Sequence, residues 1–298
     1  MMEPDHALTV RRRALAALLL GAACIAFAPI FVRLSDLGPV ATAFYRVLLA
    51  LPVLWFWMRQ EEKRDASTRR PSSLSDYARL SLAGVFFACD LTVWHFSITM
   101  TTVANSTLFA NAAPIWVTLG GFFLFGERFS RVFLAGLVCA VAGILLLMGE
   151  SLNISDQYLA GDAMGVAASV FYAAYIMSVG RLRHDFSTAT VMAWSGVVSA
   201  VLLAPMAMIA GDGFVAAGLT GWLILLGLAL ISHAGGQSLI AYSLAHLPAA
   251  LGAVGLLLQP VLAAVIAWFL FAEALGPLQV AGAICVLIGI YLARRGSS

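Results

Sequence analysis

Apolar stretches of membrane-spanning length follow one another along almost the whole of this chain. A helix of about 20 residues rises about 30 Å, which matches the hydrocarbon thickness of a bilayer. Of the 298 residues, 62% are hydrophobic and only 11% are charged, whereas about a quarter of a soluble domain is charged. This composition excludes the soluble classes and predicts an all-α membrane protein.

Turn and charge signals divide the chain into ten apolar segments. The predicted spans are 14–33, 40–58, 80–99, 104–125, 132–149, 162–180, 188–210, 218–245, 249–271 and 278–293. The first segment follows a run of three arginines but is long enough to span, and it leads straight into further spans. We therefore expect a retained first helix and no cleavable signal peptide.

The charged residues are distributed unevenly between the loops. With the N-terminus inside, the cytoplasmic segments contain fifteen of the seventeen basic residues, and only Arg33 lies outside, with Arg46 inside a span. The charged residues of the outer loops are mostly acidic. This asymmetry follows the positive-inside rule, so we expect both termini to be cytoplasmic. Short loops and no organellar signal favour a multi-pass protein of the bacterial inner membrane.

The chain also repeats itself at an offset of 146 residues. Residues 97–146 and 243–292 share thirteen identities in fifty positions, among them a proline, a glutamate (Glu127 on Glu273), a cysteine and two glycines. Each half contains five spans, and an odd number forces the halves into opposite orientations. We expect two inverted repeats, residues 1–150 and 151–298, around a central cavity.

These motifs resemble a known family. The segment Gly38-Pro39-Val40-Ala41-Thr42-Ala43-Phe44-Tyr45-Arg46, and the doubled pattern of Pro114, Glu127, Gly136, Gly143 and Pro260, Glu273, Gly282, Gly289, are similar to EamA-type proteins of the drug/metabolite transporter superfamily. The resemblance implies ten helices, kinked at Pro114 and Pro260, and export of small metabolites. Within the superfamily the chain resembles bacterial amino-acid exporters, including the YddG-like aromatic amino acid exporter branch.

Only two charged residues lie well inside the predicted spans, Arg46 and Asp90. A charge at the centre of a membrane helix costs about 2.5–3.5 kcal/mol on the insertion scale. Counted from the outer ends of their spans, they lie about six and about nine residues deep, which are similar depths at the helical rise. Two interpretations stay open: a static ion pair between helices, or a role in gating or in binding a substrate headgroup.

Other polar residues inside the spans are candidates for lining the substrate path. His95 is interpreted either as a proton relay or as a hydrogen-bonded packing residue. Asn111 lies in a polar stripe with Pro114, where it either lines the cavity or pairs with the carbonyl that the proline frees. Gln237 and Gln259 are candidates for hydrogen bonds to a substrate.

Aromatic residues supply candidate apolar contacts, namely Trp94, Tyr172, Tyr175 and Trp194. With so few fixed charges, such a cavity suits a neutral or zwitterionic solute, and we expect outward transport of amino acids, including aromatic ones, by alternating access. The alternatives are an exporter of drugs or other metabolites, or a multi-span enzyme, although no HExxH, GxSxG or paired-carboxylate pattern occurs in the spans. We expect the bilayer and a small molecule as partners, and no cofactor, metal or nucleic acid.

The charge asymmetry generates a prediction about topology. A cysteine introduced at Ser298 should react with an impermeant thiol reagent only after the cells are opened. One introduced between Glu150 and Gly161 should react in intact cells. Labelling of position 298 in intact cells would overturn the topology.

Overall fold

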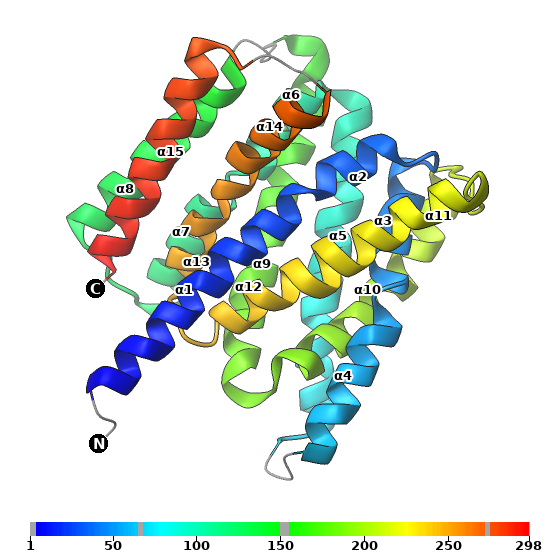
Figure 1. Cartoon of the computed structure of the whole chain (residues 1–298), viewed down its shortest axis with the longest axis horizontal. Coiled ribbons are helices and arrows are strands. Elements are labelled where there is room, and N and C mark those ends of the chain that lie inside the picture. The colour runs from blue at the N-terminus through cyan, green and yellow to red at the C-terminus, as the bar shows by residue number, and fades with distance from the viewer. Residues whose placement is uncertain (1–3, 65–67, 150–154, 272–274, 298) are drawn as a thin grey trace. The chain divides into compact units, whose positions relative to one another are not determined.

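The computed structural model describes residues 4–64, 68–149, 155–271 and 275–297, and within these ranges it is helical with no strand (Figure 1). Glu150 and Glu273, named above, lie outside the described residues. Among the described residues, ten helical segments are long and apolar enough to cross a membrane: Thr9–Leu34, Pro39–Arg64, Leu74–Met100, Asn105–Phe125, Arg131–Met148, Asp156–Asp185, Thr188–Ile209, Gly218–Ser243, Ala249–Leu270 and Pro277–Gly296. The predicted number and order of spans are confirmed. The largest differences are at the ends of the second, third and sixth spans, which continue beyond their apolar stretches.

The helices follow one another with short connections. In chain order they are α1 (Pro4–Ala26), α2 (Ala28–Leu34), α3 (Pro39–Leu48), α4 (Leu51–Arg64), α5 (Leu74–Met100), α6 (Val103–Ala110), α7 (Ala113–Phe125), α8 (Arg131–Met148), the 3-10 turn η2 (Asp156–Tyr158), α9 (Leu159–Asp185), α10 (Thr188–Ile209), α11 (Gly218–Gly227), the π-helical segment η3 (Leu228–Gln237), α12 (Ser238–Ser243), α13 (Ala249–Leu256), α14 (Leu258–Phe271) and α15 (Pro277–Gly296).

Four spans are interrupted, and each interruption lies just before a proline. The helix pairs are α1/α2, α3/α4, α6/α7 and α13/α14, and the prolines in the first turn of each second helix are Pro29, Pro52, Pro114 and Pro260. A proline lacks a backbone donor and disfavours the helical conformation of the residue before it. Thr118 donates to the carbonyl oxygen of Pro114 at 2.7 Å, so a side chain adds a polar contact to the backbone near the interruption.

The chain divides into two compact units that differ from the two sequence halves. Unit 1 consists of Met1–Thr92 and Tyr175–Leu247, and unit 2 of Val93–Ala174 and Pro248–Ser298. Each unit therefore takes helices from both halves of the sequence. Two of the three unit boundaries fall inside α5 and α9, so these two helices contribute to both units, and the third lies between α12 and α13.

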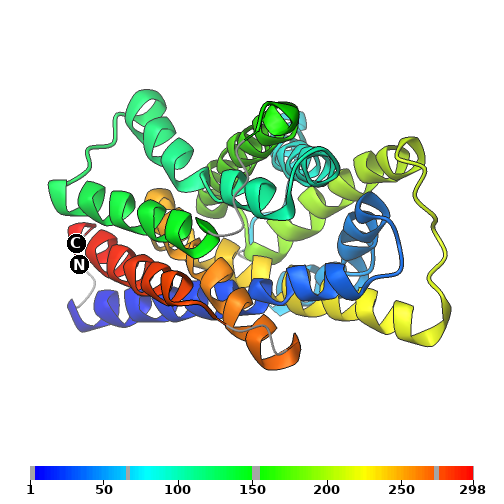
Figure 2. The ribbon, with the colours of Figure 1, turned by 90° about the horizontal axis from the view of Figure 1, so that it is seen from above.

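In unit 2, α8 and α15 pack backbone against backbone, side by side in both views (Figures 1 and 2). A Cβ atom added to Gly143 would lie 2.6 Å from the Val286 nitrogen, and one added to Gly289 would lie 2.4 Å from the Ala140 nitrogen. Small residues are the usual way for membrane helices to approach closely, since no hydrophobic effect drives them together in lipid. The paired glycines that revealed the repeat thus form this contact.

In unit 1, α1 packs on η3 and α12, while α10 packs on α3 and α4. Gly21 of α1 faces η3 so closely that an added Cβ would lie 2.9 Å from the Gly236 carbonyl oxygen. Ser232 of η3 also donates to the Cys24 carbonyl oxygen at 3.1 Å. These contacts hold the π-helical segment against α1.

Two carboxylates join the loops at one end of unit 1. Asp212 accepts a hydrogen bond at 2.8 Å from the backbone nitrogen of Ala41, in the first turn of α3. Asp36 accepts one from the Ala217 nitrogen, just before α11. Carboxylates at helix N-termini pair with donors that the helix leaves open. The acidic residues of these loops therefore cap helices of the opposite half of the chain.

The glycine contact between α8 and α15 generates the second prediction. Gly143→Leu should lower the thermal midpoint of the purified protein markedly, because the new side chain meets backbone atoms that have no room to move. Gly213→Ala is the matched control, since nothing lies within 4 Å of its added Cβ. Equal midpoints for the two variants would contradict the close packing.

Candidate functional site

The two mid-span charges both lie in unit 1. Arg46 of α3 is buried, with 8% of its surface exposed, and lies within electrostatic range of the Asp90 carboxylate of α5. Asp90 is only half-buried, although it lies at the middle of a 27-residue helix. One positive and one negative group are therefore held in the interior of the unit, where charges interact strongly.

A histidine that the sequence analysis did not select lies close to this pair. His233 of η3 is 1% exposed and is also within electrostatic range of Arg46. Gln237, at the end of the same segment, is 3% exposed. Neither ring nitrogen of His233, nor the Gln237 Oε1 atom, has a hydrogen-bond partner among the described residues. Buried polar groups are rarely left this way, and each such case needs an explanation.

An aromatic wall adjoins His233. The ring of Phe87, one turn before Asp90 on α5, stacks on His233 at 5.4 Å and lies 4.7 Å from the ring of Tyr175. Both aromatic side chains are buried. The Tyr175 hydroxyl donates to the Met192 sulfur at 3.7 Å. Charged, amide and aromatic groups from α3, α5, α9 and η3 therefore meet in the interior of unit 1.

Trp194, a predicted site residue in the same unit, lies elsewhere. Its ring contacts those of Trp55 and Tyr77 at 5.3 and 5.0 Å. Tyr77 is about 20 Å from Asp90 along α5 at the helical rise. The structure therefore brings Tyr175 and Gln237 together with Arg46 and Asp90, and places Trp194 in a separate aromatic cluster near the start of α5.

The remaining predicted residues lie in unit 2. His95 is buried and its ring lies 4.9 Å from that of Trp94, which is half-buried. Asn111, just after α6, donates to the Thr107 carbonyl oxygen at 2.8 Å. This is not the carbonyl that Pro114 frees, which is that of Ala110, so both interpretations of Asn111 remain predictions. The other two, Tyr172 on α9 and Gln259 on α14, are half-buried.

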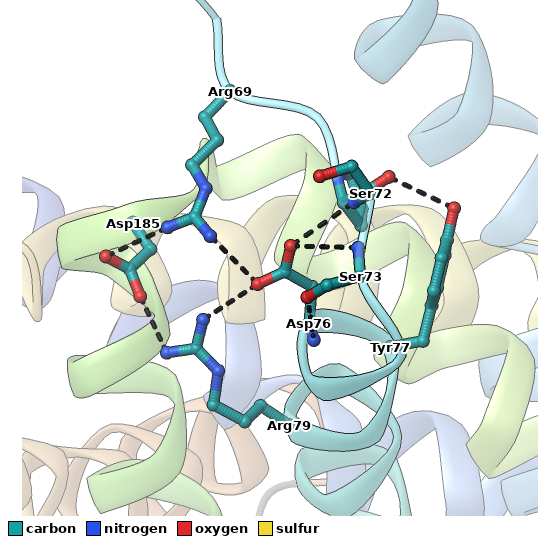
Figure 3. Close-up of polar contacts among 8 residues, drawn as sticks. Arg69, Ser72, Ser73, Asp76, Tyr77, Arg79 and Asp185 are labelled. Atoms are coloured by element: carbon teal, nitrogen blue, oxygen red, sulfur yellow. Dashed lines mark hydrogen bonds and ion pairs between the residues drawn. The ribbon is translucent and has the colours of Figure 1, made fainter.

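At the start of α5, Asp76 forms a charged network that the sequence analysis did not predict (Figure 3). Arg69 and Arg79 each place a guanidinium nitrogen 2.9 Å from its carboxylate, and Asp185 of α9 pairs with both arginines. The backbone nitrogens of Ser72 and Ser73 also donate to Asp76. The network ties the start of α5 to the end of α9.

Two signals in the sequence point to these missed residues. Ser73 and Asp76 have capping-box spacing, and the structure shows the reciprocal bonds, Ser73 nitrogen to Asp76 and Asp76 nitrogen to the Ser73 hydroxyl. His233 is a histidine inside a predicted span, which was the criterion applied to His95. Phe87 carries no comparable signal, because a phenylalanine in an apolar helix usually faces lipid or packs.

A further contact reinforces the end of α9. Arg183 donates to the Phe186 carbonyl oxygen, and the guanidinium groups of Arg69 and Arg79 lie over the Phe186 ring at 4.8 and 5.8 Å.

Partial burial, together with the nearby Arg183 charge, lowers the pKa of His246 in the loop after α12. The imidazole of His246 is therefore neutral at pH 7.

The network around Asp76 generates the third prediction. Asp76→Asn should lower the thermal midpoint in detergent more than Asp185→Asn, because Asp76 is 3% exposed and joins two arginines and two backbone donors, whereas Asp185 is 34% exposed. High salt should reduce the effect of Asp185→Asn more than that of Asp76→Asn, because exposed charge pairs are screened more than buried ones. Equal midpoints would show that the buried carboxylate does not hold this end together.

Comparison with known proteins adds a family and a fold. The profile of the EamA-like transporter family matches twice, at residues 12–149 and 159–295. An "Uncharacterized transporter" of Archaeoglobus fulgidus is 27% identical over 61% of this chain and 62% of its own length. A "Probable amino-acid metabolite efflux pump" of Salmonella typhimurium is 27% identical over 63% of this chain and 66% of its own length.

Two further matches extend over nearly the whole chain. A second "Uncharacterized transporter" of Archaeoglobus fulgidus is 24% identical over 94% of this chain and 96% of its own length. A protein of known crystal structure superposes with a TM-score of 0.77 at 18% identity, covering 96% of this chain and 98% of the other. At that identity the likeness shows the fold alone. The chain spans just under two thirds of the first two relatives and almost all of the third.

Proposed function

Because this chain belongs to the EamA-like transporter family, we propose that it exports small neutral or zwitterionic metabolites by alternating access. The proposed substrates are amino acids, including aromatic ones. The family and the ten spans make it a multi-pass membrane transporter. The name of the Salmonella typhimurium relative supports amino-acid metabolites as the substrate class. The charge asymmetry supports the bacterial inner membrane with both termini cytoplasmic.

The observation that carries the substrate class is the balance of charge inside unit 1. Arg46 and Asp90 lie within electrostatic range of each other, and their formal charges are opposite. A solute with a diphosphate needs several basic groups, and Arg46 is the one basic residue in the middle of a span. A cationic drug gains from Asp90 but is repelled by Arg46. A solute that is neutral overall needs no additional basic groups and is not repelled by Arg46.

The aromatic residues of the same unit support side-chain recognition. Phe87 and Tyr175 are both buried and lie ring to ring beside the polar groups. Stacking on a ring contributes roughly 0.5–1.5 kcal/mol beyond the burial of area. Contacts of this strength give low affinity and broad selectivity, which suits an exporter that relieves a high internal concentration. Trp94, His95, Asn111, Tyr172 and Gln259 remain proposed contacts elsewhere along the path.

The fourth prediction concerns transport in liposomes. Liposomes that contain the purified protein and are preloaded with phenylalanine should take up labelled phenylalanine by counterflow. Counterflow of a nucleotide sugar should be weaker. Tyr175→Ala should reduce phenylalanine and tryptophan counterflow more than threonine counterflow, because only the aromatic substrates lose a ring contact.

Tyr291→Ala is the matched control for this variant. Tyr291 is 57% exposed on α15, and its truncation should reduce the three substrates equally or not at all. Liposomes that move a cationic drug or a sugar, but none of the amino acids, would show that the substrate class is wrong while leaving the family and fold in place.

A further inference from the structure

The least satisfied polar groups in unit 1 lie next to its mid-span charges. His233 and Gln237 are almost fully buried, and the two ring nitrogens and the Gln237 Oε1 atom have no hydrogen-bond partner among the described residues. A neutral imidazole contains one donor and one acceptor, and an amide contains both. Burial without a partner destabilises the folded protein. A polar ligand at this place would supply the missing partners.

The segment that carries these groups is itself unusual. Residues Leu228–Gln237 are π-helical, a conformation that is rare and is often found at functional sites. The tight contact of Gly236 with α1 holds the segment in place, since a Cβ added there would lie 2.6 Å from an Ile25 carbon. The backbone therefore holds His233 and Gln237 in the interior of the unit, where their polar atoms are withdrawn from water.

The charges next to these groups define the net charge that a ligand needs. Arg46 acts on both Asp90 and His233, and the three residues come from α3, α5 and η3. An ion of either sign would leave one charge uncompensated in a low-dielectric interior, where such a charge is costly. A ligand with both an anionic and a cationic group compensates Arg46 and Asp90 together.

We infer that Arg46, Asp90, His233 and Gln237 form a binding site for the zwitterionic head of an α-amino acid. The carboxylate binds Arg46 and accepts a hydrogen bond from the His233 ring, while the ammonium group donates to Asp90 and to the Gln237 Oε1 atom. The ligand's side chain lies against Phe87 and Tyr175. This inference rests on the proposed function and adds to it the part of the substrate that every amino acid shares.

The half-buried state of Asp90 fits this assignment. Its position at the middle of α5 would place a lipid-facing carboxylate deep in the hydrocarbon, which is strongly unfavourable. Phe87, one turn before Asp90 on α5, is buried and its ring stacks on that of His233, so this side of α5 turns toward η3. Asp90 lies near this side of the helix with part of its surface exposed. A purely structural ion pair needs no such exposure.

The test compares ligands that lack one charge. In wild-type liposomes, phenylethylamine (no carboxylate) and 3-phenylpropionate (no ammonium) should each compete with labelled phenylalanine about tenfold less well than phenylalanine, or worse, because each lacks one of the two charged groups that the site binds. Equal competition by all three compounds would overturn the site while leaving amino-acid transport intact. This comparison uses the unaltered protein, so misfolding of a variant cannot obscure it.

Two variants should move the preference in opposite directions. Asp90→Asn removes the partner of the ammonium group, so competition by phenylpropionate should become stronger relative to competition by phenylethylamine. Arg46→Gln removes the partner of the carboxylate, so phenylethylamine should gain on phenylpropionate. The exposed residues Asp156 and Arg131 provide the controls, since Asp156→Asn and Arg131→Gln change the same charges and should leave the ratio unchanged.

His233→Ala provides the third arm. It should weaken competition by phenylpropionate more than by phenylethylamine, because the imidazole is assigned to the carboxylate. An unchanged ratio in the Asp90 and Arg46 variants would refute the site. Absence of counterflow for every amino acid in the wild-type protein would instead refute the proposed function, so the two failures are told apart by the phenylalanine signal alone.

Discussion

The hydrocarbon core of a bilayer contains no water to pair with backbone amides and carbonyls, so each spanning segment must pair them internally, and in this chain it does so as a helix. The same condition determines what happens where a helix is interrupted. Proline lacks a backbone donor, and polar side chains add bonds to the backbone beside one interruption: Thr118 donates to the carbonyl of Pro114, and Asn111 donates to that of Thr107.

Polar groups in unit 1 lie at three levels that differ in how well they are paired. At one end, Asp36 and Asp212 cap helices of the opposite half of the chain. At the start of α5, Asp76 accepts four hydrogen bonds from arginine and backbone donors. In the middle, both ring nitrogens of His233 and the Gln237 Oε1 atom are buried without a partner among the described residues, as are Glu61 Oε2 of α4 and Arg183 Nε of α9.

Close packing between small residues decides which side chains share a space. The glycines of α8 and α15, and Gly21 against Gly236, let backbones approach to distances that any larger residue would prevent. The first contact joins equivalent helices of the two repeats within unit 2. The second holds a π-helical segment whose polar side chains enter the middle of unit 1. Helices from both halves of the sequence therefore build each compact unit, and the sequence halves alone did not indicate that arrangement.

The number and order of the spans, the repeat and the family were determined by the sequence itself. These features depend on local hydrophobicity or on residues at fixed spacing, such as Pro114 and Pro260. None of them requires knowing which helices pack against each other. Which polar residues meet was decided only by the tertiary structure. Trp194 and Tyr175 looked equivalent in sequence, yet they lie in different clusters, and His233 was not selected at all. When a helix is apolar on every side, hydropathy does not reveal its rotation; only the packing of backbone on backbone sets which face turns inward.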